Sequence, residues 1–144
     1  MEKETLKNIF VFLKNKEYKN LPNKYLNSLS DSELIKIFET HPDDSQFVCD
    51  GNLNLRGSTI KSLPEWFKVE GDLNLNHSDI ESLPEGLEVG GNLWLIESWS
   101  LTSLPKGLYV GGSLNIKRSN FTNFSDDEIR DMIKPGFIEG EIFK

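Results

Sequence analysis

The chain has 144 residues, of which 37% are hydrophobic and 27% charged, a composition typical of a soluble globular protein with one continuous core. Its formal net charge of −7 disfavours nonspecific binding to nucleic acid or anionic membrane and leaves basic protein surfaces as plausible partners. A single cysteine, Cys49, excludes an internal disulfide, and no apolar run is long enough for a membrane span.

Residues 1–45 are predicted to form three short amphipathic helices. The first has an apolar stripe at helical spacing over residues 6–13, and the second begins at Pro22. Ser30 and Glu33 then form a capping box ahead of the third. We expect these helices to be an N-terminal cap over the segment that follows, because the apolar end of a repeat array must be shielded from water.

A unit of about twenty residues is repeated four times within residues 46–124. The copies begin VCDGNLNL, VEGDLNL, VGGNLWL and VGGSLNI, and the first three end in Leu-Pro. Their shared glycines, Gly51, Gly71, Gly91 and Gly112, lie 20, 20 and 21 residues apart. A fixed period of this size is typical of a solenoid, whose coils bury their apolar sides only by stacking on one another.

Each coil is predicted to contain one short strand. In the second coil Leu73 and Leu75 alternate with polar residues, so the leucines should point inward while Asp72, Asn74 and Asn76 point outward. Strands are expected near residues 52–56, 72–76, 92–96, 113–117 and 138–143, all in one parallel sheet. The last of these would be a terminal strand.

Residues 125–144 should close the array. Ser125 and Glu128 form a second capping box, which opens a helix predicted to run to about Ile133. Pro135-Gly136 ends that helix, and the terminal strand follows it. The predicted organisation is therefore an N-terminal helical cap over 1–45, four coils over 46–124, and a capping helix with a terminal strand over 125–144.

The repeat resembles the leucine-rich repeat family, whose coil reads L-x-x-L-x-L-x-x-N-x-L-x-x-L-P, and in particular short bacterial and phage forms with S-L-P-x-G-L-x-V-G-G. Serines replace the family's asparagine at Ser58, Ser78 and Ser119, with Ser98 or Ser100 equivalent in the third coil. The resemblance implies an α/β fold, a right-handed solenoid with a parallel sheet. It also implies a protein-binding role.

Residues suited to catalysis are scarce. His41 and His77 are the only histidines and have no metal-ligand spacing, and no nucleophile or phosphate-binding motif is present. Cys49 aligns with Val69 and Val89, which predicts a buried thiol rather than a reactive one. We therefore expect a protein that is not an enzyme and has no cofactor, catalytic residue or metal site.

Outward strand positions of successive coils should align in rows, and these rows predict a binding face. Trp94 interrupts a row of asparagines, Ile96 lies next to it, and a one-residue insertion in the same coil should push Trp99 outward. Apolar side chains on a polar sheet are typical of binding hot spots. The predicted anchors are Trp94, Ile96 and Trp99, and the predicted polar rim is Asn74, Asn115, Arg56 and Lys117.

The sequence thus predicts a non-enzymatic module that binds a protein partner through the outward face of its sheet. Analogy with phage repeats of this type makes an inhibitor of a host protein, in a bacterial or phage-infected cell, the specific form. Two alternatives are a self-assembling unit that pairs through its terminal strand, and an acidic mimic of nucleic acid. A monomer is favoured, with no nucleic-acid or membrane partner. The expected location is cytoplasmic, with signal-less secretion as the alternative.

Overall fold

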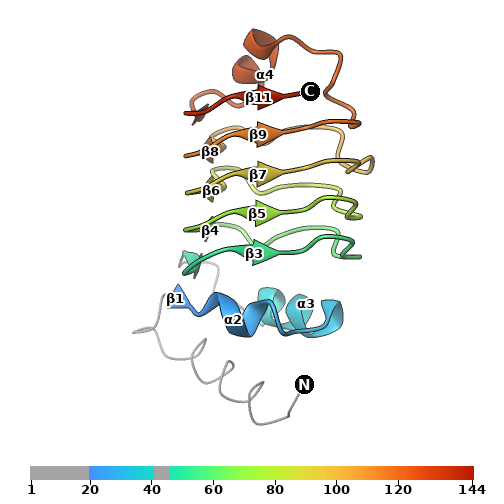
Figure 1. Cartoon of the computed structure of the whole chain (residues 1–144). Helices are drawn as coiled ribbons and strands as arrows, with labels where there is room; N and C mark the ends of the chain where they lie inside the picture. The colour runs from blue at the N-terminus through green and yellow to red at the C-terminus, as the bar shows by residue number, and fades with distance from the viewer. Residues whose placement is uncertain (1–19, 41–45) are drawn as a thin grey trace.

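A computed structural model describes residues 20–40 and 46–144, and its main body is a β-solenoid of parallel strands stacked in two sheets (Figure 1). Sheet A contains β1 (Asn20–Leu21), β2 (Phe47–Cys49), β4 (Phe67–Val69), β6 (Glu88–Val89), β8 (Tyr109–Val110) and β10 (Phe137–Ile138). Sheet B contains β3 (Leu53–Asn54), β5 (Leu73–Asn74), β7 (Leu93–Trp94), β9 (Leu114–Asn115) and β11 (Ile142–Phe143).

The predicted solenoid and its parallel strands are confirmed, but the prediction of a single sheet is wrong. The first four expected strands form sheet B, the fifth divides between β10 in sheet A and β11 in sheet B, and the residues just ahead of each repeated glycine form sheet A. Lys68 pairs with Glu88 and Val69 with Val89, so this segment also alternates between an outward and an inward residue. Its alternating segment covers only three residues before the glycine, as in 67–69, whereas the alternation that predicted sheet B extends over five, as in 72–76.

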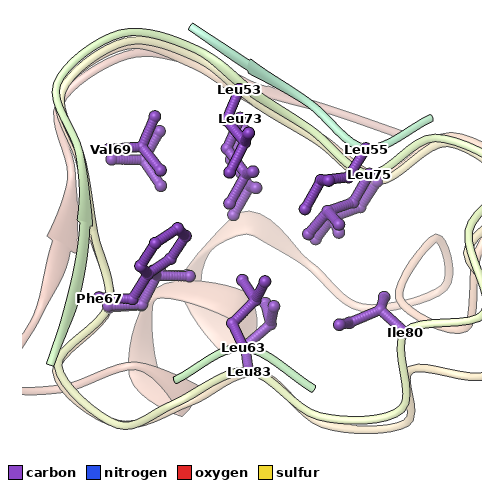
Figure 2. Packing of buried hydrophobic residues seen from close by; sticks show 14 of the residues in the cluster. Leu53, Leu55, Leu63, Phe67, Val69, Leu73, Leu75, Ile80 and Leu83 are labelled. Atoms are coloured by element: carbon purple, nitrogen blue, oxygen red, sulfur yellow. The ribbon is translucent and has the colours of Figure 1, made fainter. Parts of the chain in front are cut away.

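Identical positions of successive coils stack to form the core (Figure 2). Leu73 lies next to Leu53, Leu75 next to Leu55, and Leu83 next to Leu63, while Phe67 fills the corner beneath Val69. All of these side chains are buried. A core side chain therefore has the equivalent side chain of the next coil as its neighbour, and a coil can bury its apolar residues only within the stack.

A ladder of side-chain oxygens explains the repeated glycine. Backbone N–H groups donate to the side-chain oxygen of the preceding coil, in the pairs Asp72 to Asn52 at 2.8 Å, Asn92 to Asp72 at 2.7 Å, Ser113 to Asn92 at 2.8 Å and Glu141 to Ser113 at 3.1 Å. A Cβ added at Gly71 or Gly91 would meet the accepting oxygen of this ladder. The glycine and the polar residue after it are therefore required together.

Each of the four coils also has a serine inside its turn. Ser58, Ser78, Ser98 and Ser119 are all buried. Ser98 donates to the Leu75 carbonyl at 2.7 Å and Ser119 to the Ile116 carbonyl at 2.6 Å. Ser100 is exposed, so Ser98 is the equivalent residue in the third coil.

Helices α2 (Asn23–Leu26) and α3 (Asp31–Thr40) lie at the β3 end of the solenoid (Figure 1). The Asn27 side chain donates to the Asn52 carbonyl at 2.9 Å and accepts from the Asn54 N–H at 2.8 Å. It thus pairs with the edge of β3 much as another strand would. The helix expected over residues 6–13 lies outside the described residues.

The start of α3 is held by its capping box and by the first coil. The Glu33 N–H donates to Ser30 Oγ at 3.3 Å, and the Ser30 N–H to Glu33 Oε1 at 3.1 Å, which confirms the predicted capping box. The Thr59 N–H donates to Asp31 Oδ2 at 2.9 Å, and this bond is the main cause that lowers the pKa of Asp31. Farther along the helix, the Phe38 ring packs edge-on against Phe47 with centroids 5.5 Å apart.

Helix α4 (Asp126–Met132) lies at the opposite end of the solenoid (Figure 1), over the range expected from the sequence. The Glu128 N–H donates to Ser125 Oγ at 3.1 Å. The Arg130 guanidinium donates to the carbonyls of Ile138 at 2.6 Å and Gly140 at 3.1 Å, contacts that the sequence did not predict. Within the described residues, no helix is both long enough and apolar enough to cross a bilayer.

Cys49 is fully buried in the first coil, and burial raises the pKa of its thiol to about 11. At pH 8 the thiol therefore stays protonated in the folded protein, whereas an unfolded chain, with an ordinary thiol pKa near 8.5, forms the reactive thiolate. We expect the native protein to react with a disulfide reagent at least about 100-fold more slowly than the urea-unfolded protein. Equal rates, measured by absorbance at pH 8, would contradict a closed first coil.

Candidate binding face

The outer side of sheet B carries one row of side chains through all five strands. Strand register places Asn54 beside Asn74, Asn74 beside Trp94, Trp94 beside Asn115, and Asn115 beside Phe143. We call this row, with the residues two positions after it, the sheet B face. Phe143 was missed from the sequence, although aligning Gly140 with Gly112 would have placed it in the row of Trp94.

The asparagines of this row have a structural role at the ends of their strands. Each accepts a hydrogen bond from the backbone N–H two residues later, which is an Asx turn at the strand end. Backbone N–H groups donate to the asparagine Oδ1 atoms in three pairs: Arg56 to Asn54 at 3.1 Å, Asn76 to Asn74 at 3.0 Å, and Lys117 to Asn115 at 3.2 Å. Asn74 and Asn115, predicted as rim residues, are therefore also part of the fold.

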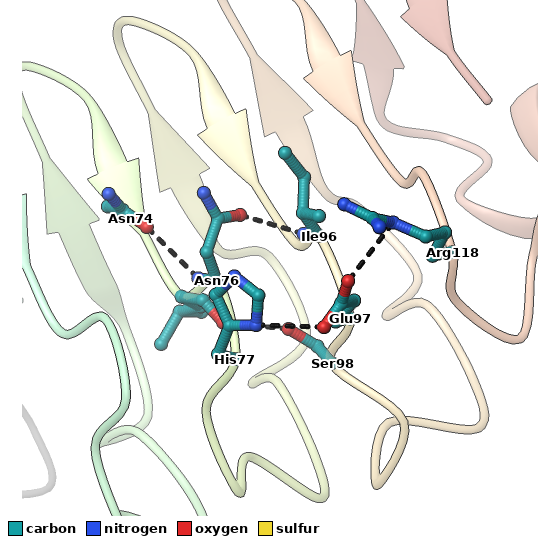
Figure 3. Close-up of polar contacts among 8 residues, drawn as sticks. Asn74, Asn76, His77, Ile96, Glu97, Ser98 and Arg118 are labelled. Atoms are coloured by element: carbon teal, nitrogen blue, oxygen red, sulfur yellow. Dashed lines mark hydrogen bonds and ion pairs between the residues drawn. The ribbon is translucent and has the colours of Figure 1, made fainter.

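Trp94 cannot accept such a bond, and a residue of the preceding coil replaces it. The Ile96 N–H donates to Asn76 Oδ1 at 2.7 Å (Figure 3). Asn76 is only 7% exposed, so the prediction that its side chain points into solvent is wrong. Its position in the next row is held by exposed Arg56 in the first coil and exposed Lys117 in the fourth. The tryptophan and the buried asparagine therefore form a coupled pair.

Trp94 borders a hollow on the sheet B face. The hollow has a volume of about 190 Å³ and is lined by Asn92, Trp94, Ser113, Asn115 and Phe143. Trp94 is half-buried, and Phe143 at the other side of the hollow is 41% exposed. Ile96 is half-buried as well, so neither Trp94 nor Ile96 is as fully exposed as the sequence suggested.

Trp99 lies in the turn that follows Ile96, and 57% of it is exposed, as predicted for a residue pushed out by the insertion. The Asn120 side chain holds this turn by donating to the carbonyls of Trp99 and Leu101, both at 2.8 Å. Sequence reasoning missed Asn120. Its position directly after Ser119, in the coil that stacks on the insertion, is the only signal that could have suggested it.

A row of polar side chains borders the face beside Ile96. Glu97 accepts from Arg118 Nε at 3.0 Å and lies 3.0 Å from His77 Nδ1 (Figure 3). All three residues have positive φ angles: 56° for Glu97, 48° for Arg118 and 56° for His77. Gly57, at the equivalent position of the first coil, has φ 69°. Partly exposed ion pairs add little stability, so this row mainly sets the charge at the edge of the face.

The predicted residues are thus brought together in part. Asn74, Trp94 and Asn115 are neighbours in the row, and Ile96 follows Trp94 along the chain, whereas Arg56 and Lys117 lie in the first and fourth coils with two coils between them. Among the described residues, no cluster of His, Cys, Asp or Glu side chains has the arrangement to hold a metal ion. The chain matches no protein-family model, no curated protein and no solved structure.

Proposed function

We propose that this chain is a non-enzymatic module that binds a protein partner through the sheet B face, with Trp94 as the central anchor. The observation that carries the proposal is the coupled pair of Trp94 and Asn76. Three other coils use an asparagine at the position of Trp94 to close their own strand end. In the third coil the tryptophan is present although another residue must satisfy the Ile96 N–H, so stability does not account for it.

The chemistry of the face favours a small apolar epitope with polar surroundings. The hollow between Trp94 and Phe143 suits one apolar side chain of a partner, and Trp99 and Ile96 extend the apolar area. Asn74, Asn115, Arg56 and Lys117 supply a polar rim. Because neighbouring strands lie about 4.8 Å apart, five strands span only about 20 Å. That width suits a compact epitope rather than a partner wrapped around the solenoid.

The same proposal covers the organisation of the chain. The resemblance to leucine-rich repeats, the N-terminal and C-terminal helices as end caps, a cytoplasmic location, and inhibition of a host protein are parts of it. The caps are supported by two contacts: Asn27 pairs with the free edge of β3, and Arg130 binds carbonyls of the last coil. Both contacts satisfy backbone groups that would otherwise be left at the ends of the stack.

The proposal is tested with the substitution Trp94→Asn, which supplies the residue used by neighbouring coils. We expect partner affinity to fall by about 2 kcal/mol or more, since a central tryptophan is removed, while the melting temperature stays within a few degrees of that of the wild type. Affinity capture from the native host would compare both proteins as bait, and calorimetric titration of the captured partner would then measure the loss.

Two outcomes would contradict the proposal. Full affinity in a double variant with Trp94→Asn and Trp99→Ala would move the interface away from the sheet B face. An elution volume that decreases as the wild-type protein is concentrated, and that no longer does so when Phe143 is replaced by serine, would favour self-assembly through β11 instead.

A further inference from the structure

The outer side of sheet A carries a second aromatic surface, on the other sheet of the solenoid from the sheet B row. Strand register aligns Lys68, Glu88, Tyr109 and Phe137 in one row. Two positions earlier, the same register aligns Trp66, Gly86, Gly107 and Pro135 in a second row. Neither row is expected from the sequence, whose repeats predict only one sheet.

Trp66 occupies a position that other coils give to glycine. Gly86 and Gly107 have φ angles of 72° and 77°, and Trp66 has φ 59°, in the region that glycine adopts most easily. Trp66 is 60% exposed, more than any other large apolar side chain among the described residues. A bulky residue in left-handed backbone that is mostly in solvent is not explained by packing of the core.

Trp66 forms one wall of a groove on this side. The groove has a volume of about 540 Å³, and its lining includes Trp66, Gly86, Gly107, Tyr109, Pro135 and Phe137. The two glycines lack side chains, so the groove is open between Trp66 and the Phe137 ring, which packs edge-on against Tyr109 with centroids 5.1 Å apart. Three coil spacings of about 4.8 Å separate the two ends, which gives a length of about 14 Å.

The Tyr109 end of the groove is acidic. The Tyr109 hydroxyl donates to Glu139 Oε1 at 2.6 Å. The hydrogen bond to Glu139, with burial and the charges of Glu139 and Glu88, raises the pKa of Tyr109, so both carboxylates act on this hydroxyl. Lys68 Nζ lies 3.7 Å from Glu88 Oε2 and offsets part of that negative charge. Because both side chains are over one-third exposed, solvent weakens this ion pair.

We propose that this groove binds an extended, proline-containing segment of a protein partner that carries a basic residue. Proline-rich segments adopt an open helix with about 3.1 Å per residue, and such helices dock in grooves lined by aromatic rings. A groove about 14 Å long accommodates four to five of these residues, from Trp66 over the glycines to Phe137. The arginine or lysine then lies at Glu88 and Glu139, where the charge is complementary.

The experiment follows the indole N–H signals of the full-length protein by NMR while a blocked peptide, PPLPPR, is added. The chain has three tryptophans, so each signal is assigned by single substitution. We expect the Trp66 signal to shift saturably with Kd of about 1 mM or tighter. Binding should weaken at least about fivefold for AALAAR, which lacks the prolines, and for PPLPPE, which reverses the charge.

Trp66→Gly serves as the matched variant, because two other coils carry glycine at this position with the same sign of φ. The variant should keep the wild-type melting temperature within a few degrees and lose the peptide response of the Phe137 ring signals. Glu88→Gln, which leaves the apolar groove intact, should weaken PPLPPR about threefold or more and should not weaken PPLPPE, which has no basic residue to pair with Glu88.

Four results would overturn the proposal: no saturable shift of the Trp66 signal, equal binding of PPLPPR and AALAAR, a shift produced by a soluble oligosaccharide but not by PPLPPR, or a shift of the Trp66 signal when the protein alone is concentrated. The last would mean that a second copy covers the groove. None of these outcomes depends on the sheet B face, whose Trp94 signal reports separately in the same spectra.

Discussion

Replacing Gly91 by alanine should lower the melting temperature of the protein by about 10 °C, which corresponds to about 3 kcal/mol for a chain of this size. The added Cβ would overlap Asp72 Oδ1, which accepts the Asn92 N–H at 2.7 Å. The carboxylate would have to leave the ladder, and the Asn92 N–H would lose its acceptor between two coils. Nearby backbone atoms of Gly71 prevent the strand from moving aside.

Gly86→Ala is the matched control for this prediction. Its Cβ would meet no atom within 4 Å, but its φ is 72°, so only the backbone preference of alanine opposes the change. We expect a loss of about 1 kcal/mol there. Differential scanning calorimetry of the two variants compares a steric cost with a conformational one. Equal melting temperatures would show that the side-chain ladder does not determine where the repeat needs glycine.

Replacing Asn76 by alanine should destabilise the wild-type protein by about 2 kcal/mol, because the partly buried Ile96 N–H loses the oxygen that it binds at 2.7 Å. The same change should cost about 1 kcal/mol less in a protein that already carries Trp94→Asn. In that protein the asparagine introduced at position 94 can accept the Ile96 N–H itself, as Asn74 and Asn115 accept the N–H two residues later in their own coils.

Urea denaturation of the wild type, both single variants and the double variant closes this thermodynamic cycle. A coupling energy of about 1 kcal/mol is expected, and the slope of each transition should stay constant. Strictly additive losses would mean that Asn76 does not compensate for Trp94. Trp94 would then carry no structural cost that binding has to explain, whether or not a partner is found.

The two proposed surfaces lie on different sheets of one solenoid and can be separated by substitution. Trp94→Asn removes the anchor of the sheet B face, and Trp66→Gly removes a wall of the sheet A groove. Both variants introduce a residue that other coils use at the equivalent position, so each should fold. A partner that loses affinity with both variants would contact two sides of the solenoid.

Several features of this protein were determined by the sequence alone. The glycine spacing and the inward leucines predicted the stacked coils, and the capping signals at Ser30 and Ser125 predicted where α3 and α4 begin. The alignment of Cys49 with buried valines predicted its burial. These features depend on local patterns, such as periodicity and capping, that the chain displays within one coil or one helical turn.

The tertiary structure decided which residues of different coils are neighbours. Sheet A, and with it the groove at Trp66, was missed because its apolar-polar alternation covers only three residues per coil, against five in sheet B. The burial of Asn76 and the place of Phe143 in the Trp94 row arise from hydrogen bonds and register between coils about twenty residues apart. No local pattern encodes such a partner, because each one depends on which atom of the next coil the stacked backbone brings within reach.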